Sequence, residues 1–346
     1  MSAILEARSL RKVYPGGRTR GGVDHVAVDN FSLIAGADRP CFVTIAGESG
    51  SGKTTIARLL LGMTGPTSGE VRFRGTPLNQ LRGEVRRLYR REVQAIFQDP
   101  FEVYNPFYRV DHLLVTPLRR FGLAATKEQA YELARQALEA VGLRSEETLG
   151  RYPHQLSGGQ RQRITIARAL ALHPRLIIAD EPVSMVDASL RATILDSLRR
   201  LYRDHDIGFL YITHDLTTAY QVSDDIVILY RGTVVESGPV VSVIGDPRHP
   251  YTQALIDSIP APDPGTSWLA ERIDSDAADT GGEPIGGCPY AGICPQLRDT
   301  CHQSTPPRYD LGAGREAACF LYRDRPEIET ALSAGTTRDG GTDEAP

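Results

Sequence analysis

Hydrophobic residues along this chain gather in short runs that polar or glycine-rich segments separate. Residues 41–46, 93–97 and 176–179 form runs with the length of strands that are buried on both faces. A similar run covers residues 208–213, and segments with a helical pattern stand between the runs. This alternation predicts an α/β fold built around a largely parallel sheet.

A different pattern precedes the first of these runs. Residues 3–14 alternate between polar positions such as Glu6 and apolar positions such as Leu5, as in a strand with one buried face. A second strand of this kind is predicted over residues 26–33. The two strands predict an antiparallel sheet laid against the core. Further strands are predicted over residues 70–75, 225–230 and 233–236.

Helical periodicity is clearest in the middle of the chain. Thr126 and Gln129 have the spacing of a capping box at a helix start, and Gly142 stands where the helix would end. The apolar face of this helix would consist of Tyr131, Ala134, Leu138 and Val141. We therefore predict a helical subdomain over about residues 99–160, inserted in the α/β chain.

Five apolar residues lie before this helix, and two interpretations of them are open. They pack most simply in the core, but several together beside Gln98 could also form a docking surface. The five residues are Phe101, Val103, Tyr104, Phe107 and Tyr108.

The composition is that of an ordinary globular protein. The chain has 346 residues, of which 41% are hydrophobic and 24% charged. Its length predicts one large domain over residues 1–255 and a smaller C-terminal extension over residues 256–330. Residues 260–286 are rich in Pro, Gly, Asp and Ala and predict a linker or surface loop, and residues 331–346 predict a disordered tail.

Charge and hydropathy narrow the choice of partners and of location. The formal net charge is -4 and the pI is near 6.1, so no basic footprint favours nucleic acid as a partner. No apolar run approaches the ~20 residues of a membrane-spanning helix. Because Glu6 and Arg8 interrupt the stretch where a signal peptide would be apolar, we expect the chain to stay in the cytoplasm.

The candidate chemistry begins at a glycine-rich stretch that follows the first buried run. Its glycines permit backbone angles that let successive N–H groups turn towards a polyphosphate at the positive end of the next helix. Lys53 can then reach the β- and γ-phosphates, and the Thr54 hydroxyl is placed to ligate Mg²⁺. We therefore predict a nucleotide site. The stretch reads Gly47-Glu48-Ser49-Gly50-Ser51-Gly52-Lys53-Thr54-Thr55.

Polar side chains also follow three other buried runs. Ligands of parallel α/β sheets lie at the carboxyl ends of the strands, where these residues stand. Asp180 is expected to hold Mg²⁺ through water, and Glu181 to orient or deprotonate the attacking water. His214 is expected to contact the γ-phosphate. Gln98 is either a solvated loop residue or a group that reaches the metal or the attacking water.

Two further features complete the expected site. Tyr14 could stack on adenine, or it could be a strand-end tyrosine packed on the sheet. A second helix start with paired glycines offers another anion site, which one chain with one phosphate loop does not need. This second start consists of Leu156, Ser157, Gly158, Gly159 and Gln160.

In their order along the chain, these motifs resemble those of the ATP-binding subunits of ABC transporters, over about residues 3–250. The resemblance implies a P-loop NTPase cassette with a RecA-like core, an antiparallel β subdomain and a helical subdomain, which binds ATP and Mg²⁺ and hydrolyses ATP. Ser184-Met185-Val186-Asp187 would be the D-loop, with a bulkier middle than is usual in the family. The resemblance also implies that the phosphate loop is the Walker A motif, that Gln98 is the Q-loop residue and that residues 156–160 are the signature. Asp180 and Glu181 would be the Walker B motif with its catalytic glutamate, and His214 would be the switch histidine.

The resemblance also implies partners and a location. Such subunits pair head to tail, so that each ATP lies between one subunit's phosphate loop and the other's signature. A second ATP-binding subunit is therefore expected, with a heterodimer favoured. Two membrane-spanning permease subunits and, indirectly, an extracytoplasmic substrate-binding protein would complete the assembly at the cytoplasmic face of the cell membrane.

Two segments, residues 98–106 and 248–255, are similar to the oligopeptide, dipeptide and nickel branch of importers. The implied function is uptake of di- or oligopeptides, with nickel or another small solute as the alternative cargo. An ABC ATPase that acts on nucleic acid would carry long coiled-coil segments or a second cassette, which this chain does not have. A non-catalytic cassette is opposed by Glu181, His214 and the intact signature.

Four cysteines near the C-terminus are spaced Cys288-x5-Cys294-x6-Cys301-x17-Cys319. They could form two disulfides, a zinc site or an iron–sulfur cluster, or be incidental thiols. A cytoplasmic location argues against disulfides, and the spacing lacks the short Cys-x2-Cys motif of common zinc sites. We favour a [4Fe–4S] cluster over Zn²⁺, and the resemblance supports it because peptide-importer ATPases carry a similar cysteine set. Cys41, in a core strand, is expected to take no part.

Overall fold

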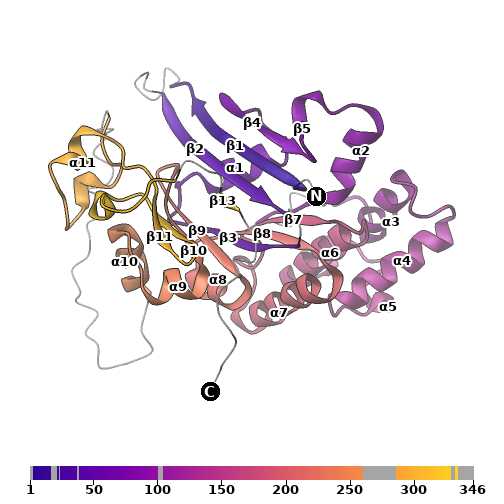
Figure 1. Ribbon diagram of the computed structural model, residues 1–346. Helices are drawn as coiled ribbons and strands as arrows, with labels where there is room; N and C mark the ends of the chain where they lie inside the picture. The colour runs from indigo at the N-terminus through magenta and orange to yellow at the C-terminus, as the bar shows by residue number, and fades with distance from the viewer. Residues whose placement is uncertain are drawn as a thin grey trace, which may run out of the picture.

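The computed structural model describes residues 3–16, 22, 24–36, 39–99, 104–259, 286–328 and 332–333. Within these ranges, two sheets and the helices around them make up the molecule (Figure 1). The expected linker lies outside the described residues except for Gly286, and the expected disordered tail lies outside them except for Leu332–Ser333.

The smaller sheet contains the N-terminal strands, in the order β13-β2-β1-β4-β5. Strand β1 pairs antiparallel with β2 on one side and with β4 on the other, as the alternating pattern predicts. Leu5 and Ala7 point into the core, and Arg8 is exposed. The strands are β1 Leu5–Tyr14, β2 His25–Ala35, β4 Ser68–Phe73, β5 Thr76–Pro77 and β13 Leu332–Ser333.

The larger sheet has the strand order β11-β12-β10-β9-β3-β8-β7-β6. Its strands from β9 to β6 run parallel, so their carboxyl ends meet at one edge. The parallel strands are β3 Phe42–Ala46, β6 Val93–Ile96, β7 Leu176–Asp180, β8 Gly208–Thr213 and β9 Asp225–Tyr230. This edge is where the sequence places the candidate chemistry.

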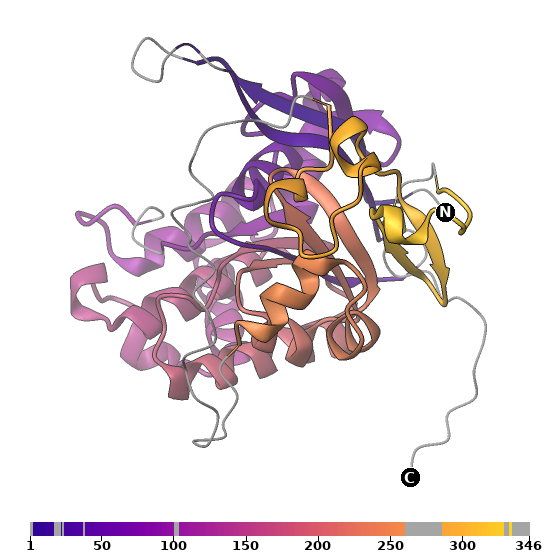
Figure 2. The ribbon, with the colours of Figure 1, turned by 90° about the vertical axis from the view of Figure 1, so that its left-hand side faces the viewer.

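An antiparallel hairpin carries the larger sheet into the C-terminal extension. Strand β10 (Thr233–Pro239) turns back from β9 at Arg231-Gly232, where both residues have positive φ. Strand β12 (Arg315–Ala317) then pairs with β10, and β11 (Tyr309–Gly312) pairs with β12. Figure 2 shows the extension, in yellow, against this side of the molecule. The extension therefore continues the sheet of the core.

Helices cover both faces of the larger sheet. The longer ones are α1 Lys53–Leu60, α2 Gly83–Glu92, α3 Val110–Arg120, α4 Lys127–Ala140, α6 Gly158–Leu170, α7 Ala188–His205, α8 Leu216–Val222 and α10 Pro250–Asp257. Short helices are α5 Ser145–Thr148, α9 Val240–Gly245 and α11 Thr300–Gln303, with 3₁₀ turns at Leu78–Gln80, Pro153–Gln155, Ala291–Ile293 and Phe320–Tyr322.

Three clusters of buried apolar side chains hold these layers together. One lies between the two sheets and includes Leu5, Ile45 and Ile56 of helix α1. A second joins the opposite face of the larger sheet to helices α3, α4, α6 and α7. The third packs the C-terminal extension on α8, α9 and α10. Burial of apolar surface on this scale supplies the main stabilisation of the fold.

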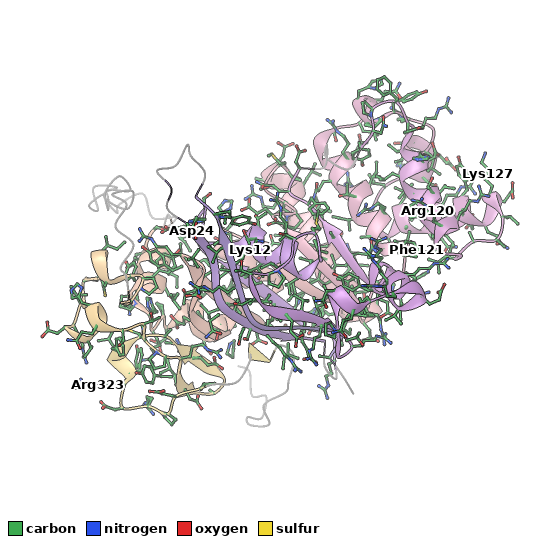
Figure 3. The ribbon with its side chains drawn as sticks, turned by 90° about the horizontal axis from the view of Figure 1, so that it is seen from above. Lys12, Asp24, Arg120, Phe121, Lys127 and Arg323 are labelled. Atoms are coloured by element: carbon green, nitrogen blue, oxygen red, sulfur yellow. The ribbon has the colours of Figure 1, made fainter. Side chains whose placement is uncertain are left out.

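The helical part and the extension lie at opposite ends of the molecule. Lys127 of α4 marks one end and Arg323 of the extension marks the other when the molecule is seen from above (Figure 3). The capping box predicted at Thr126 and Gln129 is present. Within the described ranges, no helix combines the length and the apolar content that a membrane crossing needs.

The aromatic residues before the helical part are not all in the core. Phe107 is 86% exposed and Tyr108 is 51% exposed, so the core interpretation is wrong for these two. Tyr104 is half-buried, and its hydroxyl donates to the Arg161 carbonyl at 2.8 Å. Phe101 and Val103 lie outside the described residues.

Candidate active site

The glycine-rich stretch forms a loop between β3 and α1. Gly52 is the N-cap of α1 with φ 101°, and a Cβ atom there would lie 2.2 Å from the Ala27 carbonyl oxygen. A Cβ at Gly47 would lie 2.2 Å from the Leu229 carbonyl oxygen. Neighbouring backbone therefore excludes any side chain at both positions, which explains why glycine is needed in this loop.

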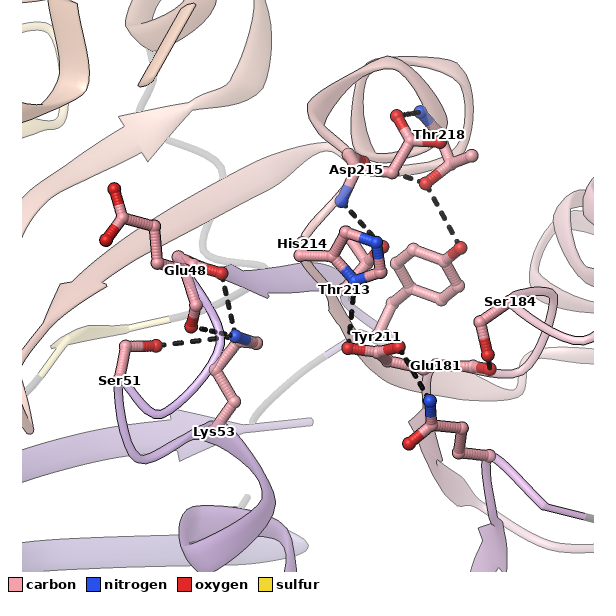
Figure 4. A network of polar contacts seen from close by, with 12 residues as sticks. Glu48, Ser51, Lys53, Glu181, Ser184, Tyr211, Thr213, His214, Asp215 and Thr218 are labelled. Carbon is pink, nitrogen blue, oxygen red and sulfur yellow. Dashed lines mark hydrogen bonds and ion pairs between the residues drawn. The ribbon is translucent and has the colours of Figure 1, made fainter. Parts of the chain in front are cut away.

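Lys53 is the first residue of α1, and its side chain folds back over the loop. Its Nζ donates to the Gly47 carbonyl at 2.7 Å and to the Glu48 carbonyl at 2.6 Å (Figure 4). Burial lowers the pKa of Lys53, and the carboxylates of Glu181, Asp180 and Glu48 oppose this shift. An anionic phosphate would favour the charged form of this buried ammonium group.

Glu181 stands at the centre of a polar cluster at the end of β7. Its Oε1 lies 2.9 Å from Nδ1 of His214, and its Oε2 accepts a hydrogen bond from Nε2 of Gln98 at 3.1 Å (Figure 4). The Ser184 hydroxyl donates to the Glu181 carbonyl at 3.0 Å. The structure thus brings together the glutamate, glutamine and histidine that the sequence placed on three separate strand ends.

The backbone of Glu181 has φ 46°, a conformation that is costly for a residue with a side chain. Its N–H donates to the Ile212 carbonyl of β8 at 2.9 Å, which fixes this conformation. The turn aims the carboxylate at Gln98 and His214.

The burial and hydrogen bonding of the Asp180 carboxylate show whether a cation fits the site. It is 7% exposed, and burial raises its pKa while a hydrogen bond from the Thr54 hydroxyl opposes the rise. Its Oδ1 is buried and has no hydrogen-bond partner in the described part of the chain. A buried carboxylate oxygen without a partner, next to a hydroxyl, suits Mg²⁺, which prefers oxygen ligands.

One cavity of about 690 Å³ unites most of these groups. Tyr14 stands at its border, 37% exposed, with Lys12 Nζ 5.1 Å from the ring centroid. A volume of this size accommodates a nucleotide. The lining residues are Tyr14, His25, Ala27, Glu48, Ser49, Gly50, Gly52, Lys53, Thr54, Thr55, Gln98, Glu181, His214 and Leu255.

The second helix start does not belong to this cavity. In the described part of the chain, none of Ser157, Gly158, Gly159 and Gln160 lines it. Ser157 is the N-cap of α6 and forms a capping box with Gln160, with bonds of 3.2 and 2.9 Å. Ser157 is exposed and Gly158 partly so. This N-terminus is therefore available to a ligand that another molecule carries.

A contact behind the phosphate loop was not predicted from the sequence. The hydroxyl of Tyr251, in α10, accepts a hydrogen bond from the Glu48 N–H at 3.0 Å. Leu255 of the same helix lines the cavity. The similarity of residues 248–255 to importers marked this helix, but the pattern gave no sign that it touches the loop.

The predicted [4Fe–4S] cluster is wrong, and the zinc alternative has no support. All four cysteines are described, yet no group of three or more His, Cys, Asp or Glu side chains among the described residues could hold a metal ion. Burial raises the pKa of Cys288 and Cys294, and that of Cys319 to about 11, so burial favours the neutral thiol at these three residues. Cys288 and Cys301 instead pack in the apolar cluster under the extension.

The chain is similar to known ATP-binding cassettes in sequence and in fold. Residues 37–184 match the family model described as ABC transporter. A solved dimer of an ATP-binding cassette, in a post-hydrolysis state with ADP and Pi, is 28% identical with a TM-score of 0.61, and the match covers 68% of this chain and 98% of that one. The fold is that of an ATP-binding cassette.

The family follows from the full-length relatives. The probable peptide ABC transporter ATP-binding protein y4tS of Sinorhizobium fredii is 39% identical over 98% of both chains. The putative oligopeptide transport ATP-binding protein YkfD of Bacillus subtilis is 40% identical over 93% of this chain and 96% of its own. Residues 235–301 match the oligopeptide/dipeptide transporter C-terminal region. The chain therefore belongs to the ATP-binding proteins of ABC transporters that carry this C-terminal region.

Proposed function

We propose that this chain hydrolyses ATP to drive the import of di- or oligopeptides through separate membrane subunits. The observation that carries the proposal is the position of Glu181, which borders the same cavity as the phosphate loop and contacts both Gln98 and His214. The names of the relatives and the match of residues 235–301 support peptides as the cargo.

Each group has a defined task in this proposal. The loop N–H groups and Lys53 bind the phosphates of ATP, and Tyr14 stacks on adenine. Thr54 and Gln98 would ligate Mg²⁺ and Asp180 would hold it through water, and the bound ion neutralises charge on the phosphates. Glu181 orients the attacking water and takes its proton as the bond from the γ-phosphorus to the bridging oxygen breaks and ADP leaves. His214 contacts the γ-phosphate and steadies the Glu181 carboxylate.

The open N-terminus of α6 leads to the expected partners. We assign Ser157, Gly158, Gly159 and Gln160 to the γ-phosphate of an ATP held by a second cassette, in a head-to-tail pair that is a heterodimer in our proposal. Two permease subunits would hold this pair at the cytoplasmic face of the membrane, and a substrate-binding protein would deliver cargo to them. The solved cassette with ADP and Pi supports pairing, because it is described as dimeric.

The variant Glu181→Gln tests hydrolysis in the purified complex. It should still bind ATP, because Lys53 and the loop are unchanged, while turnover falls by about a hundredfold or more as the water loses its proton acceptor. Glu139→Gln, an exposed position on α4, makes the same chemical change far from the site and should leave turnover unaltered. Near-normal turnover in Glu181→Gln would remove Glu181 from this role.

A further inference from the structure

The hydrogen bond between the phosphate loop and α10 joins residues that are 203 positions apart in the chain. Tyr251 is 2% exposed, so its hydroxyl has no ready access to water. Burial raises the pKa of this hydroxyl, which keeps it neutral. The buried Tyr251 hydroxyl would lose its partner if this bond broke, which would cost free energy, so the bond constrains the loop.

The Glu48 peptide is fixed from both sides. Its N–H donates to Tyr251 at 3.0 Å, and its carbonyl accepts from Lys53 Nζ at 2.6 Å. When Lys53 turns to the phosphates of a nucleotide, its bonds to loop carbonyls weaken or break. The bond to Tyr251 does not compete with the nucleotide, because the single proton of the Glu48 N–H is already directed at the tyrosine. Tyr251 can therefore hold this part of the loop while the following N–H groups bind phosphate.

The position of Tyr251 depends on the C-terminal extension. Its backbone N–H donates to Nδ1 of His249 at 3.0 Å, which caps α10. Its ring lies against Tyr230 of β9, with ring centroids 4.6 Å apart, and against Tyr290 of the extension at 5.6 Å. Tyr290 also contacts Tyr230 edge-on at 5.2 Å. Tyr290 of the extension is thus part of the aromatic cluster that fixes the position of the Tyr251 hydroxyl.

We propose that Tyr251 is a positioning residue for nucleotide binding, and that the C-terminal extension raises the affinity for ATP by packing Tyr290 against it. The proposal rests on the phosphate loop as the ATP site and is independent of the cargo. In this proposal the extension acts on ATP binding through the Tyr290 ring and the Tyr251 hydroxyl.

Equilibrium binding of a fluorescent ATP analogue to the purified full-length chain, with ATP as competitor, tests this. Tyr251→Phe keeps the ring and removes only the hydroxyl, and should weaken ATP binding about threefold to tenfold, the effect of one hydrogen bond. In the complex, the variant should raise KM for ATP and leave kcat at saturating ATP unchanged. Tyr290→Phe is the matched control, because in the described structure its hydroxyl makes no bond to the loop, and it should bind as the parent does.

Tyr290→Leu, which removes the ring, should weaken binding in the same direction, and it should add little in a Tyr251→Phe background because both act through the same bond. Wild-type affinity in Tyr251→Phe would overturn the proposal, as would a lowered melting temperature with unchanged KM, which would make the tyrosine only structural. Equal losses in Tyr251→Phe and Tyr290→Phe would also overturn it. Failure of the parent chain to bind ATP would instead refute the proposed function.

Discussion

At the scale of single residues, several positions have a conformation or an environment that costs free energy, and chemistry or packing requires it there. Glu181 adopts a left-handed backbone at the end of β7, and Lys53 and Asp180 are charged groups in a buried place. His249 is a fourth example, outside the cavity. It is 1% exposed, and its Nδ1 accepts the N–H of Tyr251, so the ring must be neutral at that nitrogen.

His249 makes stability depend on pH. Burial lowers its pKa from 6.5 to about 4. The unfolded chain therefore binds a proton at this residue between about pH 6.5 and 4 while the folded chain does not, so the free energy of unfolding falls as pH drops through that window. The loss from this residue should be about 2 kcal/mol at pH 5.

Melting temperatures at pH 7 and pH 5 check this expectation. His249→Asn keeps a good N-cap acceptor but cannot titrate, so its melting temperature should fall less between the two pH values than that of the parent. His302→Asn, at an exposed position, should behave as the parent does. An equal fall in His249→Asn and the parent would show that His249 is not the titrating group.

At the scale of elements, features that depend on nearby residues were predicted correctly from the sequence, whereas contacts between residues far apart in the chain were not. The capping box at Thr126 depends on neighbours in sequence, and it is present. Exposure of Phe107 depends on which distant elements cover it, and its apolar character alone suggested burial. The contact from Tyr251 to the loop has the same cause, because sequence spacing carries no information about packing across 203 positions.

The prediction of a [4Fe–4S] cluster at the four C-terminal cysteines was wrong for a related reason. Their spacing was compatible with a ligand set, but among the described residues no three or more His, Cys, Asp or Glu side chains form a group that could hold a metal ion. Cys288 and Cys301 lie in an apolar cluster with Tyr251 and Tyr290, and burial raises the pKa of Cys288. The backbone N–H of Cys288 donates to the Cys301 carbonyl at 2.7 Å, so apolar packing and backbone bonds order this segment.

The N-terminus of α6 provides the prediction at this scale. A Cβ at Gly158 would meet only the Met185 carbonyl, at 3.9 Å, so Gly158→Asp should fold normally. The new carboxylate would face the γ-phosphate held by the partner cassette, and repulsion should lower turnover at least about tenfold while ATP still binds to this chain's own loop. Gly158→Ala, which adds bulk without charge, should lose much less. ATP-driven pairing and normal turnover in Gly158→Asp would refute the shared site.

At the scale of the whole molecule, the extension and the cassette form one body. Arg315 of β12 donates to buried Glu236 of β10 at 3.0 Å, and the same carboxylate accepts the N–H groups of Arg248 and His249. This buried ion pair fixes the orientation of the two strands, and breaking it would leave an uncompensated charge. The carboxylate of Glu236 thereby joins β12 of the extension to the start of α10, whose Leu255 lines the cavity.

Uptake of labelled di- and oligopeptides into proteoliposomes, which contain the permease subunits, both ATP-binding subunits and the substrate-binding protein, tests the central claim most directly. The account predicts uptake that requires ATP with the parent chain and that falls to background with Glu181→Gln at unchanged assembly and ATP binding. Peptide uptake that proceeds equally with both chains, or an assembly that consumes ATP with the parent chain but moves no peptide, would contradict it.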